Sequence, residues 1–209
     1  MSVTPQRFAR LALVLSILAA ASSSIHAQEL KDRQLTHAYD FTTVQMPVEV
    51  VAIRLNGKEI VTGEKIKGDD DWLRGISFTV KNISDQPIAY VNIGFKFPRP
   101  NGFLVYSLPY GVSMVQGERR NASSPPAIQP GQSVNLVLTK QLYESSFLYV
   151  LAQADVPSKF DTVAYYVDTV CFEDQPDVIW QFGHLKRRHP TEPLRFDVFE
   201  RYVLPGKQQ

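Results

Sequence analysis

The chain lacks the disulfide bonds that stabilise many small exported proteins and the short motifs that identify many enzymes. Its 209 residues include one cysteine, Cys171, so no disulfide can form within it. A fold without such a crosslink depends on its hydrophobic core. The sequence contains no Gly-x-Ser-x-Gly, His-Glu-x-x-His or Cys-x-x-Cys pattern and no glycine-rich phosphate loop. These absences favour a protein that is not an enzyme and holds no cofactor.

An excess of charge of either sign is also absent. The chain has 22 Lys and Arg against 21 Asp and Glu, a net charge of +1. Removal of residues 1–27, which include Arg7 and Arg10, leaves 20 basic against 21 acidic residues, a net charge of −1. This balance gives no electrostatic reason to expect nucleic acid or an anionic membrane surface as a partner. The predicted partner is therefore an unidentified protein or glycan.

Residues 1–27 have the pattern of a secretory signal peptide. Arg7 and Arg10 precede an apolar run over residues 11–21, and a small-residue stretch ends at Ala27. An uncleaved membrane anchor is the alternative, but the run is shorter than the ~20 residues that span a bilayer. No later apolar run reaches that length. We therefore expect export to a periplasm or the cell exterior, a flexible lead-in at residues 28–45 and a single domain at residues 46–204.

Most of this domain is predicted to be β-structure. In ISFTVK (residues 76–81) apolar and polar residues alternate, which is typical of a strand with one buried face. Asn56-Gly57, between two apolar runs, predicts a hairpin because both residues tolerate positive φ. The predicted strands are residues 48–55, 75–82, 88–97, 132–139, 162–172 and 178–183.

Two segments depart from the strand pattern. Apolar residues recur at helical spacing after Thr139, a favourable cap, and predict one helix near residues 140–155. Residues 101–130 are rich in Gly, Pro and Ser and are expected to form a mobile loop. Short strands separated by turns, with one helix, predict a mostly β fold, an immunoglobulin-like antiparallel β-sandwich.

Three stretches of the sequence resemble segments of other proteins. They are DDWLRGISFTVKNISDQPIAYVNIGFKFP (70–98), IQPGQSVNLVLT (128–139) and VDTVCFEDQPDVIWQFG (167–183). The Asp-Trp-Leu lead, the V-K-N-x-S-x-x-P-I turn and the late Phe-to-Trp hairpin resemble a group of exported bacterial proteins of unknown function. This resemblance implies an exported immunoglobulin-like sandwich and no particular activity. Where that group has Asp-Gly-Thr, this chain has Asp174-Gln175-Pro176-Asp177, a longer turn.

The stretch from residue 168 to residue 190 holds most of the reactive side chains. Glu173, Asp174 and Asp177 offer oxygen ligands for Ca²⁺, but a solvated acidic turn in a β-hairpin explains them as well. The same two interpretations apply to the acidic run at residues 69–71. His184 and His189 lack the three- or four-residue spacing of helical zinc ligands and are interpreted as surface histidines. No metal ligand is assigned.

The remaining candidates also have structural interpretations. Cys171, in an alternating strand, is interpreted as a small buried hydrophobe because no base for a cysteine nucleophile is identifiable. The basic run at residues 186–188 is too short for a nucleic-acid patch and is expected on a charged strand edge that discourages pairing. The aromatic residues have two interpretations. If exposed, they form a platform for a sugar or a peptide, but aromatic residues in alternating strands usually fill the core, which is the interpretation favoured here.

The prediction is a non-enzymatic exported β-sandwich that acts as a surface binding or assembly module. A structural subunit that pairs through a strand edge is a related hypothesis. The alternative from another class is a carbohydrate-active or other hydrolase, with two carboxylates roughly 5 to 10 Å apart near residues 101–130 or near the turn at residues 173–177. No catalytic residue is assigned, and the weak candidates for a ligand surface are Trp72, Trp180, Glu173, Asp177 and His184.

Overall fold

The computed structural model describes residues 30–39, 44–99, 102–113, 121, 123–157 and 159–205. The predicted signal peptide lies outside the described residues, as do residues 114–120 of the predicted loop. Among the residues that are described, no helix is both long and apolar enough to cross a membrane.

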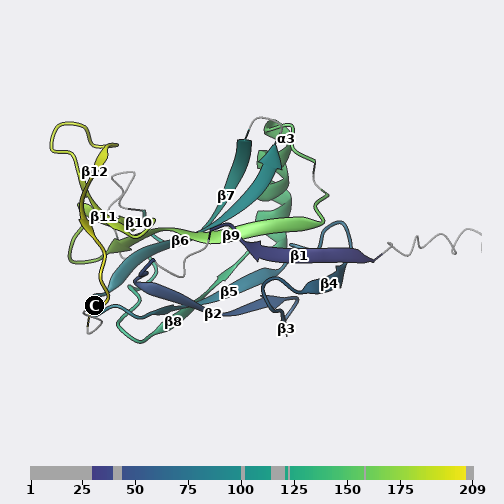
Figure 1. Ribbon diagram of the computed structural model, residues 1–209, viewed down its shortest axis with the longest axis horizontal. Coiled ribbons are helices and arrows are strands. Elements are labelled where there is room, and N and C mark those ends of the chain that lie inside the picture. The colour runs from purple at the N-terminus through teal and green to yellow at the C-terminus, as the bar shows by residue number, and fades with distance from the viewer. Residues whose placement is uncertain are drawn as a thin grey trace, which may run out of the picture.

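Two packed β-sheets form the body of the molecule (Figure 1). The larger sheet has the order β12-β11-β10-β9-β1-β4, and β6, which carries β7 on its other side, also pairs with β9. The smaller sheet has the order β3-β2-β5-β8. Most pairs are antiparallel, whereas β1 and β9 run parallel. The strands of the larger sheet are β1 (Lys31–His37), β4 (Lys65–Gly68), β6 (Ile88–Arg99), β7 (Gly102–Gly111), β9 (Thr162–Phe172), β10 (Val178–Gln181), β11 (His184–Arg188) and β12 (Phe196–Arg201). Those of the smaller sheet are β2 (Val48–Leu55), β3 (Lys58–Glu59), β5 (Ile76–Asn82) and β8 (Ser133–Val137).

The prediction of a mostly β, sandwich-like fold is confirmed, and the immunoglobulin-like subtype stays a prediction. Alternation in β5 buries Ile76, Phe78 and Val80, which are each 0% exposed. The Phe78 ring meets the Phe95 ring of the opposite sheet edge to face, with ring centres 5.6 Å apart. Aromatic packing of this kind adds to simple area burial, so the core between the sheets depends on these rings.

Two predicted hairpins are confirmed. Asn56 and Gly57 have φ values of 50° and 81° and join β2 to β3, as a tight two-residue turn requires. The stretch around the acidic turn forms the β9–β10 hairpin, in which Ile179 lies opposite Cys171. The cysteine is completely buried there, as its structural interpretation predicted.

The helix is confirmed at its predicted place but is not regular. Its turns are α2 (Lys140–Leu142), the π-helical segment η2 (Tyr143–Phe147) and α3 (Leu148–Gln153). Thr139 caps the start, because its hydroxyl oxygen accepts a hydrogen bond from the Leu142 N–H at 3.2 Å. Phe147 is buried and its ring meets Phe97 of β6 at 5.5 Å, so the helical segment covers one end of the core.

Three segments differ from expectation. The predicted flexible lead-in contains β1, which lies between β9 and β4 in the larger sheet. The predicted mobile loop contains β7, whose pairing with β6 runs from Tyr90–Gly111 to Arg99–Gly102. The basic run at residues 186–188 lies on β11, between β10 and β12, so the prediction of a charged edge strand was wrong. In all three segments, pairing with other strands determines the structure, and the local sequence pattern does not reveal it.

Candidate functional site

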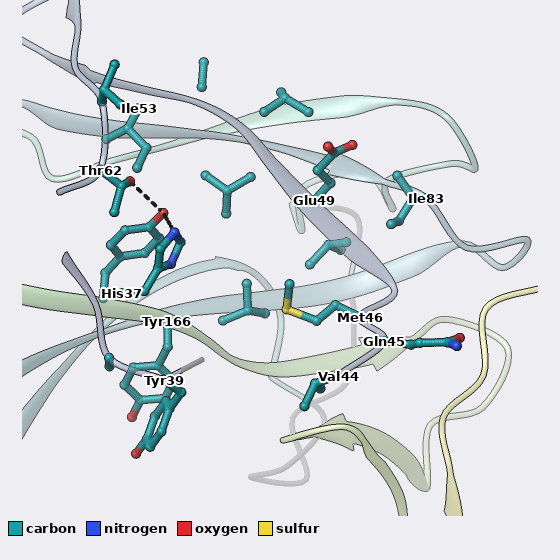
Figure 2. A pocket seen from close by; sticks show the side chains of 18 of the residues that line it. His37, Tyr39, Val44, Gln45, Met46, Glu49, Ile53, Thr62, Ile83 and Tyr166 are labelled. Carbon is teal, nitrogen blue, oxygen red and sulfur yellow. Dashed lines mark hydrogen bonds between the residues drawn. The ribbon is translucent and has the colours of Figure 1, made fainter. Parts of the chain in front are cut away.

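The two sheets separate along one side and leave a cavity of about 1410 Å³, here called the inter-sheet groove. The sandwich positions it between β2 of the smaller sheet and β9 of the larger one, as seen in the close view of Figure 2. Its lining residues are 37–39, 44–46, 48–53, 59–62, Ile83, 165–167, Arg201 and Leu204. Most of these side chains are aliphatic or aromatic, so the groove is a chiefly apolar space.

The first wall of the groove is β2. Six consecutive residues, 48–53, line it. Because successive side chains of a strand point to opposite faces, an unbroken run of lining residues means that the backbone edge itself faces the groove. On that edge the described residues give β2 a strand partner only at Arg54 and Leu55, which pair with β3. A register shift between Val50 and Ala52 marks a β-bulge at Val51.

The second wall is β9, where residues 165–167 line the groove. On this side β9 pairs with β1 as far as Tyr165, opposite His37, and with β10 from Val170 onward. Between these two pairings no described strand lies against this edge of β9. The groove is thus bordered by two strand edges that belong to different sheets.

A small polar cluster lies at one end of the groove. The Tyr165 hydroxyl is 3.2 Å from the Thr62 hydroxyl and 3.4 Å from His37 Nε2, and Figure 2 shows Thr62 and His37 close together. Tyr165 is only 3% exposed. Burial raises the pKa of Tyr165, although its hydrogen bond with Thr62 opposes that shift. At neutral pH the phenol is therefore protonated and serves as a hydrogen-bonding group.

Exposed apolar side chains stand at the mouth of the groove. Val51, Val61 and Ile83 are 44%, 58% and 37% exposed. Glu49 lies beside them on β2 and is exposed. Within the described residues Glu49 has no ion-pair partner, whereas Glu59 lies 3.5 Å from Arg54. The mouth therefore combines exposed apolar surface with a carboxylate that forms no close ion pair, although Lys81 of β5 lies across from it in the sheet.

The segment at residues 44–46 closes the other end. The buried Trp180 indole N–H donates to the Gln45 carbonyl at 3.1 Å, and the Gln45 side chain accepts from the Leu204 N–H. Figure 2 places Val44, Gln45 and Met46 together at this end of the groove. Trp180 is 0% exposed, so it positions this wall from within the core and does not reach the groove itself.

The five candidates from the sequence are not brought together. Trp72 is 3% exposed and its indole N–H donates to the Phe160 carbonyl at 2.8 Å. Asp177 is exposed and pairs with Arg188 at 3.2 Å, while His184 is exposed on β11. Glu173 is partly buried after β9, where its N–H donates to the Pro87 carbonyl. None of these five residues is among those that line the groove.

The acidic run at residues 69–71 has structural partners. Asp70 pairs with Arg33 at 2.8 Å and with Lys159 at 2.6 Å. Asp71 accepts a hydrogen bond from the Tyr143 hydroxyl at 3.2 Å. Among the described residues no group of three or more His, Cys, Asp or Glu side chains has the arrangement of a metal site.

Sequence reasoning missed the groove, although a signal for it exists. Val50, Val51, Ala52 and Ile53 are four consecutive apolar residues, which is more than one buried face of a strand requires. Such a run indicates a strand with apolar surroundings on more than one side. His37 gave no signal because its segment has no regular pattern, and only the parallel pairing with β9 places it in the groove.

Comparison of the chain with protein-family models, with curated proteins and with solved structures gives no match.

Proposed function

We propose that the protein is an exported, non-enzymatic β-sandwich that works as a binding module and holds its ligand in the inter-sheet groove. The observation that carries this proposal is the groove itself, about 1410 Å³ between two strand edges. Pockets for drug-sized ligands usually measure about 300–1,000 Å³. A larger, chiefly apolar space suits a ligand that is long or extended.

The polar groups of the groove support binding over catalysis. A general base works best when its pKa lies near the operating pH. The pKa of Tyr165 is raised from 10.0, away from neutrality, because the ring is buried. Its hydroxyl bonds to Thr62 and His37, so it is a fixed hydrogen-bonding group in the wall of the groove. Export is supported by the pattern of residues 1–27 and by the resemblance to exported bacterial proteins.

A neutral solvatochromic dye, Nile red, tests the proposal. We expect its fluorescence to rise and shift to the blue with the wild-type protein. Val51→Asp places a charge at the mouth of the groove and should weaken dye binding about fivefold or more, ~1 kcal/mol. Val137→Asp is the matched control, since Val137 is a similarly exposed valine, at 38%, on β8 of the same sheet.

Circular dichroism of both variants establishes that they are folded. Equal dye binding by wild type and Val51→Asp would place the dye elsewhere and overturn the proposal. Failure of the wild-type protein to bind the dye at all would overturn it as well.

A further inference from the structure

We infer that the natural occupant of the groove is an extended segment of a partner polypeptide, which adds to the open edge of β2 as a further strand. This inference rests on the proposed function and names the ligand class. An unpaired strand edge carries a row of N–H and C=O groups that are ready to pair with another chain. Peptide recognition by strand addition uses these groups for affinity and side-chain pockets for specificity.

The hydrogen-bonding pattern of β2 defines the available edge. The Ile53 carbonyl accepts from the Ile60 N–H at 2.9 Å, where pairing with β3 ends. From Ile53 back to Val48, the described residues place no strand on this side, while β5 pairs with the other side except at the bulge at Val51. Six residues of strand extend over about 20 Å, which matches a peptide of six or seven residues.

The chemistry of the groove favours a peptide over a lipid. An acyl chain would fill apolar space but would give no partner to the backbone groups on the open edge of β2 between Val48 and Ala52, whose other edge pairs with β5. Buried backbone groups of this kind are nearly always hydrogen-bonded in native proteins. An incoming strand satisfies them and still presents every second side chain to the apolar interior.

The walls of the groove also indicate the sequence of the occupant. Val48 and Val50 lie opposite Asn82 and Val80 of β5, whose side chains face the core. Every second side chain of an added strand would therefore lie beside Val48 and Val50 on the core face, where apolar residues fit. Glu49, on the opposite face of β2, is exposed. A lysine or arginine of the occupant beside Glu49 would form a cross-strand ion pair. The expected segment therefore alternates apolar and polar residues and carries basic side chains.

Synthetic peptides test this inference. The probe has seven residues, alternating valine and threonine between two terminal lysines, with both ends blocked and a fluorescent label. Two further peptides have the same sequence. One carries N-methyl groups on the backbone nitrogens of its even-numbered residues, and the other carries them on those of its odd-numbered residues. Neighbouring N–H groups of a strand point to opposite edges. We therefore expect one methylated peptide to bind as the probe does and the other to bind tenfold or more weakly, as measured by fluorescence anisotropy.

A charge exchange tests the ion pair. Glu49→Lys should weaken the lysine-ended probe severalfold and strengthen a glutamate-ended peptide. Glu144→Lys, at an exposed position in the helical segment, is the control and should change neither affinity.

The outcomes separate this inference from the proposed function. If Val51 controls Nile red binding but both methylated peptides bind as the probe does, or no peptide binds, strand addition is wrong and the groove remains a ligand site. Strand addition is also wrong, and the groove is a lipid site, if 1-monolaurin binds in the groove and no peptide displaces it. If sedimentation shows a dimer of the protein alone that the probe does not dissociate, the occupant is a second copy and the inference is overturned. If neither dye nor peptide binds, both ideas fail.

Discussion

Arg33 of β1, 1% exposed, donates to the Asp70 carboxylate at 2.8 Å. The same guanidinium donates to the Asp161 carboxylate at 2.5 Å and to the Phe160 carbonyl at 2.9 Å. Asp70 precedes the buried Trp72, and Asp161 precedes β9. One side chain thus connects the first strand to two distant segments of the chain. This arrangement fixes β1, and therefore His37 at its end, against β9.

Arg33→Met should destabilise the fold. Methionine fills much of the same space but removes all four hydrogen bonds that Arg33 donates, to Asp70, Asp161 and the carbonyls of Phe160 and Gly68. The Phe160 carbonyl still accepts from the Trp72 indole N–H. Hydrogen bonds to charged groups contribute about 1.5–3 kcal/mol each, and partial compensation by Lys159 at Asp70 reduces the loss. We expect the free energy of unfolding to fall by roughly 2 kcal/mol, measured by urea denaturation.

Arg74→Met is the matched control, because Arg74 is 41% exposed and its nearest carboxylate lies 4.0 Å away. Exposed pairs of this kind contribute little. Equal losses in the two variants would show that Arg33 has no special role.

Acid sensitivity should depend on Asp70. Its hydrogen bond from Lys159, and then that from Arg33, hold the pKa of Asp70 below the ordinary value of 3.8. A carboxyl group whose pKa is lower in the folded state stabilises the fold above its unfolded pKa, and this contribution is lost as the pH falls through the folded pKa. Asp70→Asn should therefore flatten the decline of stability below about pH 4. A decline as steep as that of the wild type, in urea denaturation at stepped pH, would contradict this role.

The strands with short-range signals were predictable, and those ordered by distant partners were not. β2 and β9 have the predicted bounds because β-branched and aromatic residues alternate or run together there. β7 was missed, since Gly102 and Pro109 interrupt its pattern and only the ten-residue pairing with β6 makes it a strand. β1 was missed for the same reason, as its polar residues become buried only against the rest of the fold.

The groove could not be predicted because it is a relation between sheets. Val51 and Tyr165 are 114 positions apart and belong to different sheets, yet both line it. Periodicity identifies which residues leave the solvent, but it does not say where two sheets stop touching. The reactive residues of the β9–β10 turn attracted attention because they are close in sequence, whereas the groove gathers residues that are distant in sequence.

Gly94→Ala should destabilise the larger sheet. A Cβ at this position would lie 2.7 Å from two ring carbons of Tyr166, a distance that requires the ring or the backbone to move. Overpacking of this kind costs about 1–3 kcal/mol. Tyr166 also stacks on Phe182 and meets the Tyr39 ring edge to face, with ring centres 5.8 and 5.2 Å apart, so two neighbouring rings limit its movement.

A double mutant checks the cause. In a Tyr166→Leu background the ring is gone, and Gly94→Ala should then cost well under 1 kcal/mol in urea denaturation. An unchanged cost in that background would place the strain elsewhere.

Two buried tyrosines should respond oppositely to loss of the hydroxyl. Tyr143 donates to Asp71 at 3.2 Å, and Tyr143→Phe should lower stability by about 1 kcal/mol. The Tyr202 hydroxyl is buried, and the described residues offer it no hydrogen-bond partner. Tyr202→Phe removes an unsatisfied polar group and should raise stability by up to about 1 kcal/mol at neutral pH. A loss of stability in Tyr202→Phe would show that the hydroxyl has a partner in solution.

Alkaline titration extends the test of Tyr202. Burial, reinforced by the charge of Asp85, raises the pKa of Tyr202 to about 12. A phenol whose pKa is higher in the folded state stabilises the fold fully below its unfolded pKa of about 10, and loses that contribution as the pH rises toward 12. Between about pH 10 and pH 12, the free energy of unfolding of Tyr202→Phe, measured by urea denaturation, should therefore fall less steeply than that of the wild type. Parallel declines of the two proteins would mean that Tyr202 ionises as easily when folded as when unfolded, and that its ring is not enclosed beside Phe172.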